Sequence, residues 1–384
     1  MEDMAPETYA YLTEALDYIQ RYALRSRHVD WETIRSEALV RIQDAVVPAD
    51  TYPVIRWVLS CLGDRHSHLV SPQRSQESQA GKITAMGISA VYPERVIVDV
   101  HAHSPAEQAG LQVRDTITAL SGIPVAQLDR VAFMRALYAS PLTLTFTRAN
   151  QECPSSVTLH SGPYIREMKP RGRLLEPGIG YLELPAVTGN TNILKTYAQT
   201  AQQYIRDMDG LGIRHWVIDL RRNGGGDMWA MVVGVQALLG DGAWGFFVLP
   251  DGTKTSWLPT KSVKSHLLLG EAYSLTHPIA AIAVLTSRLT CSAGEFTALA
   301  FRGRPDTRSF GEPTAGLPTA NQHTILRDGA QLFLTVALGA DRTGHSYDGP
   351  IVPDQVVASD WTLFQTERDP VVTEAQAWFV LGRE

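Results

Sequence analysis

Two apolar runs in the second half of the chain, each followed by a turn and a helical pattern, constrain the fold most. Residues 215–220 form a short apolar run that leads through the glycine-rich segment 221–227 into an apolar helix. Residues 282–286 form a second run, and helical spacing of apolar residues follows over 293–301. Because strands that alternate with helices are typical of a layered α/β architecture, we expect an α/β core at residues 170–384.

Ser292 stands at the end of the second turn, directly before the helical pattern. The first N–H groups of a helix have no intrahelical partner and lie at the positive end of the helix dipole. They can therefore stabilise the oxyanion that would form if this serine attacked a carbonyl group. Serine is also a preferred helix N-cap. The motif alone leaves catalysis and capping open, since a base, an orienting group and an oxyanion hole must come from elsewhere.

The glycine-rich segment carries Gly224, Gly225 and Gly226 between the first run and its helix. Successive glycines let the backbone approach a ligand closely and present N–H groups to it. A phosphate-binding loop is the alternative, but no Gly-Lys-Ser/Thr sequence follows. We therefore expect an oxyanion hole rather than a nucleotide site.

Composition excludes several classes of protein. The chain has 384 residues and a net charge of -6, without a basic cluster, which argues against a nucleic-acid or membrane-surface partner. Its three cysteines are far apart and give neither a disulfide framework nor a metal-binding spacing. No apolar stretch is long enough for a membrane span, and the acidic N-terminus does not begin a signal peptide. We expect a cytoplasmic protein, although an export signal that had been removed would leave the same sequence.

Residues 8–63 indicate helices within an N-terminal helical region of residues 1–75, and a polar, linker-like segment covers residues 71–81. One apolar stripe has helical spacing and consists of Leu12, Ala15, Leu16, Ile19 and Ala23. The third expected helix stops at Gly63, and His66 and His68 follow it. A lone histidine is more often structural or solvated than catalytic, so both remain candidates at this point.

Residues 82–165 indicate a compact β-rich domain with a well-marked helix start. Ser104 is the expected cap, Pro105 occupies the first helical position, and Glu107 completes a capping box. The run Ser-Pro-Ala-Glu-Gln-Ala-Gly-Leu, followed by Asp-Thr-Ile, resembles the signature of PDZ domains, with Arg114 where a glycine is usual.

The PDZ resemblance implies a peptide-binding loop at Gly87, Ile88 and Ser89. PDZ domains take the end of an extended peptide by adding it as a strand, backbone to backbone. A PDZ-like domain that serves only as a structural lid is the alternative, because a fold alone does not determine a function.

Four motifs in order extend the resemblance over nearly the whole chain. They are Asp-Leu-Arg-Arg-Asn-Gly-Gly-Gly at 219–226, Thr-Cys-Ser-Ala-Gly-Glu at 290–295, Gly-Glu-Pro-Thr-Ala-Gly at 311–316, and Val-Pro-Asp at 352–354. Together they resemble the C-terminal processing (tail-specific) peptidase family, and within it the tricorn-core and retinoid-binding-protein-like branch. The resemblance implies a PDZ domain joined to a crotonase/Clp-protease-like α/β core.

The same resemblance implies that Ser292 is the nucleophile and that the N–H groups of Gly226 and Ala293 form the oxyanion hole. The processing peptidases use a lysine as the base, but Leu317 stands at the lysine position here. No lysine follows Ser292 in the chain. A serine–lysine dyad of the family type is therefore excluded.

The other branch uses a histidine in a Leu-Gly-x-x-His pattern, which matches residues 62–66 and favours His66 over His68. Arg65 precedes it where tricorn-type sites have a serine. An acidic residue then orients the imidazole. The resemblance places Asp348 in this role, although aspartate reaches less far than the usual glutamate. Glu295 is the competing acid, and its alternative role is a carboxylate at a helix N-terminus.

The sequence thus predicts a serine endopeptidase that cleaves peptides or proteins near their C-termini through an acyl-enzyme, without a metal or an organic cofactor. Nothing in it indicates an oligomeric state. A catalytically inactive peptide- or ligand-binding relative of the same fold is the alternative. Acyl-CoA chemistry on the crotonase-like core is a third reading, which the PDZ-like domain argues against.

Overall fold

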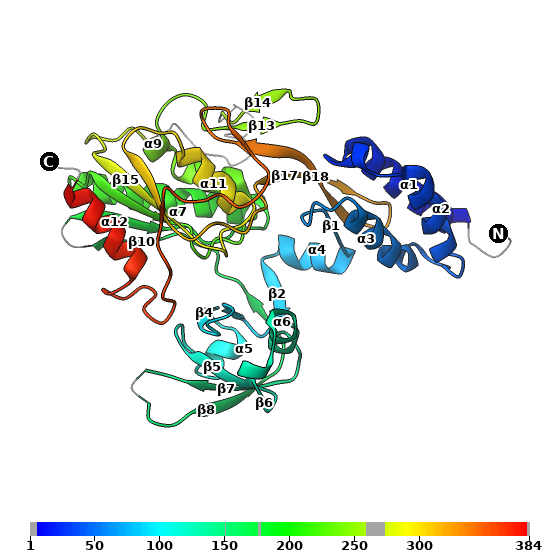
Figure 1. The fold of residues 1–384 in the computed structure, drawn as a ribbon, viewed down its shortest axis with the longest axis horizontal. Coiled ribbons are helices and arrows are strands. Elements are labelled where there is room, and N and C mark those ends of the chain that lie inside the picture. The colour runs from blue at the N-terminus through cyan, green and yellow to red at the C-terminus, as the bar shows by residue number, and fades with distance from the viewer. Residues whose placement is uncertain (1–5, 150, 176–177, 259–272, 382–384) are drawn as a thin grey trace.

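The computed structural model describes residues 6–149, 151–175, 178–258 and 273–381, so the start of the acidic N-terminus lies outside the described residues. Figure 1 shows three parts: an N-terminal helical region, a β-rich lobe, and an α/β core that carries the C-terminus. No helix among the described residues has the length and hydropathy to cross a membrane.

The N-terminal region is helical, as predicted. Its elements are α1 (Pro6–Tyr22), η1 (Ser26–His28), α2 (Trp31–Arg41), η2 (Pro48–Thr51), α3 (Tyr52–Cys61), β1 (His68–Val70) and α4 (Pro72–Gln79). The predicted stripe from Leu12 to Ile19 is buried, which confirms the face of α1. The linker interpretation of residues 71–81 was wrong, because Pro72 occupies a first helical position and starts the polar helix α4.

The β-rich lobe surrounds a core of its own. Its elements are β2 (Lys82–Ala85), β3 (Ile88–Ala90), β4 (Ile97–Val100), α5 (Pro105–Gln108), β5 (Thr116–Leu120), β6 (Ile123–Pro124), η3 (Val125–Gln127), α6 (Arg130–Leu137), β7 (Leu142–Thr147), β8 (Ser155–Leu159) and β9 (Gly162–Ile165). Ser104 caps α5 through the N–H of Glu107, as predicted. The Glu107 carboxylate, however, accepts from His103 N rather than from the cap residue.

The core is a six-stranded sheet in the order β10-β11-β12-β15-β16-β20. Its strands are β10 (Arg171–Leu175), β11 (Ile179–Glu183), β12 (His215–Asp219), β15 (Ala281–Thr286), β16 (Thr307–Gly311) and β20 (Gln355–Val356). From β11 onward neighbouring strands are parallel, and only β10 is antiparallel. Parallel strands put their carboxyl ends at one edge, so β12 and β15 direct both predicted turns to the same place.

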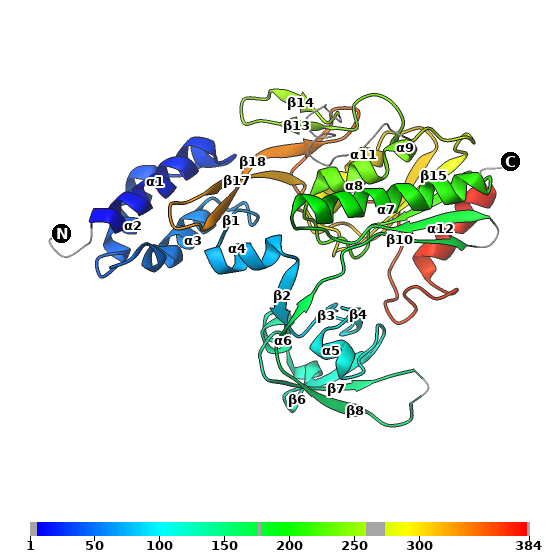
Figure 2. The ribbon, with the colours of Figure 1, turned by 180° about the vertical axis from the view of Figure 1, so that it is seen from behind.

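Helices cover both faces of this sheet (Figure 2). They are α7 (Thr191–Gly210), α8 (Met228–Gly234), α9 (Gln236–Leu239), α11 (Ala293–Phe301) and α12 (Pro370–Leu381). Successive strand residues point to opposite faces, so Ile218 packs with α7, α8 and α11, whereas Val217 packs with α12. The predicted α/β core is confirmed.

A second sheet joins the beginning of the chain to its end. The long strand β18 (Gln331–Ala340) pairs with β17 (Thr319–Ile325), β1, β13 (Phe246–Val248) and β19 (Ser346–Tyr347), and β13 also pairs with β14 (Lys254–Ser256). Leu332 and Leu334 of β18 lie in one apolar cluster with the helices α1–α3. The N-terminal helices therefore share their core with a strand from the C-terminal part.

We expect Leu334→Ala to destabilise the protein by about 2–5 kcal/mol, because Leu334 is fully buried and the change leaves a cavity under the N-terminal helices. Urea unfolding followed by circular dichroism measures the loss. Val40→Ala is the control, since Val40 is 60% exposed and its loss changes stability by only about 0.5 kcal/mol. Equal unfolding midpoints for the two variants would contradict this packing.

Candidate active site

Ser292 lies on a strained turn between β15 and α11. Its backbone has φ 53° and ψ -118°, a conformation that residues other than glycine seldom adopt. Backbone strain of this kind gathers at functional sites, and a sharp strand-to-helix turn presents the side chain at the end of the sheet. The predicted order of strand, turn, serine and helix is confirmed.

Glu295 holds the Ser292 turn in place. Its buried carboxylate accepts hydrogen bonds of 2.5–2.9 Å from four donors, which are Ser292 N, Thr314 Oγ1, Gly316 N and Leu317 N. Burial raises the pKa of Glu295, and these four hydrogen bonds act in the opposite direction. All four partners donate, which suits an ionised carboxylate that ties the turn to the loop 314–317.

The glycine-rich segment packs directly against the Ser292 turn. Cys291 N donates to Asn223 O at 2.9 Å, and Asn223 Oδ1 accepts from Gly225 N at 2.9 Å. A Cβ on Gly225 would lie 2.8 Å from Cβ of Ser292, so only glycine fits there. This role of Asn223 was not predicted, because its place beside three glycines was its only signal in the sequence.

Two backbone N–H groups are left for a ligand at this junction. Within the described residues, neither Gly226 N nor Ala293 N donates a hydrogen bond. Gly226 has φ 115°, and Ala293 is 3% exposed at the first position of α11. Ala293 is buried, whereas Gly226 is exposed, so its N–H group is accessible to a ligand. Two unpaired N–H groups next to the Ser292 turn suit an incoming oxyanion.

The buried Arg221 links the glycine-rich segment to the start of the Ser292 turn. The guanidinium of Arg221 donates to the carboxylates of Asp219 and Asp369 at 2.6–3.1 Å. The Arg221 carbonyl accepts from Ser287 Oγ at 2.6 Å, which joins the glycine-rich segment to the start of the Ser292 turn. The sequence analysis did not predict this network, because Asp369 lies 148 residues away along the chain.

His66 reaches the site from the N-terminal region. Its Nδ1 lies 2.7 Å from Thr319 Oγ1, at the end of the loop that Glu295 holds. Burial lowers the pKa of His66 to about 4; the nearby His68 acts in the same direction and Asp64 opposes it. The ring is therefore neutral at physiological pH. Among the described residues, no hydrogen bond joins His66 to Ser292.

The two acids that the sequence suggested for His66 are engaged elsewhere. Asp348 is paired with Arg25 at 2.7 Å, and its side chain is 54% exposed. Among the described residues, no ion pair joins this carboxylate to His66. Glu295 bonds the Ser292 turn, as described above. The structure therefore places neither carboxylate on the imidazole.

Comparisons with known proteins give the family of the core and of the β-rich lobe. Residues 178–357 match Peptidase family S41, and residues 96–148 match the PDZ domain. The chain is 26% identical over 384 residues to a carboxyl-terminal-processing protease of Synechocystis sp., with 96% of this chain and 82% of that protein covered. The match identifies residues 178–357 as an S41 peptidase domain.

Other relatives of the chain are more distant or matched over a shorter length. It is 34% identical to the nisin-resistance protein of Lactococcus lactis subsp. lactis, over 49% of the chain and 58% of that protein. A lipoprotein from Streptococcus agalactiae has the same fold at a TM-score of 0.67 and 19% identity, with 99% of each chain covered. A photosystem II D1 C-terminal processing protease has a TM-score of 0.61 at 22% identity, covering 96% and 97%.

The family and its processing-protease relatives make the chain a serine-type peptidase, a hydrolase. Both matched ranges lie inside the predicted domains 82–165 and 170–384, whose boundaries, like those of 1–75, stay predictions. Three relatives are named as chloroplastic, so the cytoplasmic location also stays a prediction.

The predicted peptide-binding loop lies at the start of β3. Gly87 has φ 83°, and a Cβ there would meet Cβ of Ser104 at 2.1 Å. Ile88 is buried in the core of the lobe. Within the described residues β3 pairs only with β4, so its other edge is open to an added strand.

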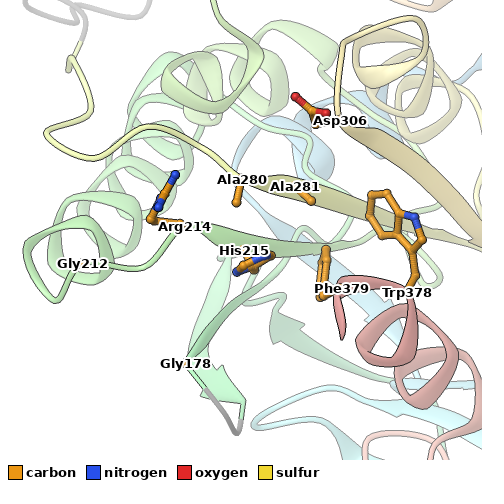
Figure 3. Close-up of a pocket in the computed structure, with 9 residues that line it drawn as sticks. All are labelled: Gly178, Gly212, Arg214, His215, Ala280, Ala281, Asp306, Trp378 and Phe379. Atoms are coloured by element: carbon orange, nitrogen blue, oxygen red, sulfur yellow. The ribbon is translucent and has the colours of Figure 1, made fainter. Parts of the chain in front are cut away.

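A cavity of about 670 Å³ lies at the opposite edge of the main sheet, where the parallel strands begin. Figure 3 shows that Arg214, His215 and Trp378 line it. None of the predicted catalytic residues lines this cavity, and the strands separate it from Ser292.

We expect Gly226→Ala to lower kcat/KM by at least about 100-fold, the size of effect seen when one oxyanion donor is lost. Its new Cβ would lie 1.9 Å from Val187 O at a φ of 115°, so the segment must shift. Gly224→Ala is the control, because its Cβ meets no atom within 4 Å. Peptide hydrolysis measures both variants, and full activity of Gly226→Ala would contradict the proposed oxyanion hole.

We expect activity to persist to unusually low pH, because only the neutral imidazole of His66 can take a proton. With its pKa lowered to about 4, kcat/KM should stay near its maximum at pH 5.5, where an ordinary histidine is only about one tenth neutral. A pH profile of kcat/KM measures this, and a midpoint near 6.5 would contradict it.

The control for this profile is circular dichroism at each pH. A lowered histidine pKa means that the unfolded chain takes up the proton first. The stability from this group is therefore fully present above the unfolded pKa near 6.5, and it is lost as pH falls toward 4. Values of kcat/KM are compared only at pH values where circular dichroism shows an intact fold.

Proposed function

We propose that this chain is a serine endopeptidase that cleaves peptide or protein substrates near their C-termini through an acyl-enzyme. Ser292 is the nucleophile, His66 is the general base and acid, and the N–H groups of Gly226 and Ala293 hold the oxyanion. The observation that carries the proposal is the pair of free N–H groups beside Ser292 on its strained turn.

The chemistry follows from these positions. As substrate binds, Nε2 of His66 approaches Ser292 Oγ, takes its proton, and the oxygen attacks the peptide carbonyl. The two N–H groups then stabilise the tetrahedral oxyanion. His66 passes its proton to the leaving amine and next activates the water that hydrolyses the acyl-enzyme. Hydrogen bonds between catalytic groups commonly form only in the substrate complex, which is consistent with the present separation of the two side chains.

Substrate preference is inferred from the β-rich lobe and the relatives. The open edge of β3 suits an extended peptide end, with Gly87, Ile88 and Ser89 at the position of its carboxylate. Relatives of the chain are named carboxyl-terminal-processing proteases. We therefore propose that a free C-terminal carboxylate is part of what the enzyme recognises.

We expect Ser292→Ala and His66→Ala each to lower kcat by at least about 1,000-fold while the fold stays intact, since these residues act as a unit. His68→Ala is the matched control and should stay within a few-fold of wild type, because His68 is exposed and stacks on Phe333. The assay uses two peptides that differ only in a C-terminal carboxylate or amide, and the carboxylate peptide should be cleaved faster.

Full activity in either site variant would refute the mechanism. Equal cleavage of the two peptides would refute C-terminal recognition alone. A wild-type protein that binds the peptide without cleaving it would support the non-catalytic alternative.

A further inference from the structure

The imidazole of His66 has a neutral partner where serine peptidases usually have a carboxylate. Thr319 Oγ1 lies 2.7 Å from Nδ1, and Thr319 is only 6% exposed. Asp64, the nearest acid in sequence, accepts instead from His66 N, Ser67 N and Ser67 Oγ. Its carboxylate therefore shapes the backbone around His66 and leaves the ring to Thr319.

The backbone on which the ring is mounted is held independently of Thr319. Asn321 Nδ2 donates to the His66 carbonyl at 3.1 Å, and Thr335 Oγ1 donates to Asn321 Oδ1 at 2.9 Å. Thr335 N donates to Ser67 Oγ at 2.9 Å. These bonds fasten the His66 segment to β17 and β18. These backbone hydrogen bonds do not determine the rotation of the imidazole ring or which of its nitrogens carries the proton.

We propose that Thr319 is the positioning residue of His66: its Oγ1 accepts a hydrogen bond from Nδ1–H and leaves the lone pair of Nε2 free for Ser292. This inference rests on the proposed function. When Ser292 gives its proton to Nε2, the ring carries protons on both nitrogens, and Nδ1–H still donates to Thr319. The proton on Nε2 then leaves with the amine, so Thr319 itself gains and loses none.

A hydroxyl in this place has different consequences from a carboxylate. It orients the ring but contributes no negative charge to stabilise the imidazolium. This agrees with the neutral ring that burial produces. The charged groups that act on His66 are His68 and Asp64, and neither is bonded to its ring.

The place of Thr319 in the chain also explains how base and nucleophile are kept together. Glu295 holds Ser292 N and Leu317 N, and Thr319 follows Leu317 by two residues. The loop 314–319 therefore contacts Glu295, which holds Ser292, at one end and His66 at the other.

The test compares Thr319→Val, which keeps the shape but removes the hydroxyl, with Thr319→Ser, which restores it. For Thr319→Val we expect kcat to fall on the order of 10- to 100-fold with KM unchanged, because the base remains but its orientation is lost. Thr319→Ser should recover most of this loss. Unchanged kcat in Thr319→Val, or equal loss in both variants, would overturn the proposal.

Nitrogen NMR of histidine-labelled protein reads the tautomer directly, with His66→Gln used to assign the signals. In the wild type we expect the proton on Nδ1, and in Thr319→Val a mixture of the two tautomers. A wild-type ring protonated on Nε2 would overturn the proposal. This measurement does not need activity, so it distinguishes failure of the positioning role from failure of the proposed peptidase function.

Discussion

The buried carboxylate of Glu295 is the interaction on which the candidate site depends. It accepts from the backbone of Ser292 on one side and from the loop 314–317 on the other. Removing one partner of a buried, hydrogen-bonded charge is costly, so this arrangement resists local change. It keeps a strained serine at the mouth of α11, where α11 contributes one free N–H group and the glycine-rich segment contributes the other.

The candidate site also requires that the segment of His66 be held near the Ser292 turn. The long strand β18 provides this link, because β18 pairs with β1 and β17 and packs against α1–α3. His66 thus sits on a segment fastened to the C-terminal part of the chain rather than on an independent helical domain. This pairing is what would bring the proposed base, His66, to the proposed nucleophile, Ser292, at the end of the main sheet.

Local patterns in the sequence predicted local structure well. The turn and helix at Ser292, the glycine-rich segment, the capped helix at Ser104 and the alternation of strands and helices all follow from spacing and from residue type. The polar helix α4 escaped prediction because it has almost no apolar stripe. In the site, the sequence did not indicate that Glu295 would clamp two loops, since its partners are 19–22 residues further along.

The partner expected for His66 shows the limit of sequence reasoning. Asp348 was suggested by its place in a motif, but its carboxylate contacts Arg25, 323 residues away, and such pairings leave no trace in local spacing. Thr319 carries no charge and belongs to no catalytic motif, so only the structure brings it to His66.

The most direct test of the central claim is covalent labelling with a fluorophosphonate, followed by peptide mapping. The account predicts a single adduct on Ser292 in the wild type, and a much slower reaction in His66→Ala although Ser292 is still present. No adduct on Ser292, or equal labelling rates with and without the imidazole, would contradict it.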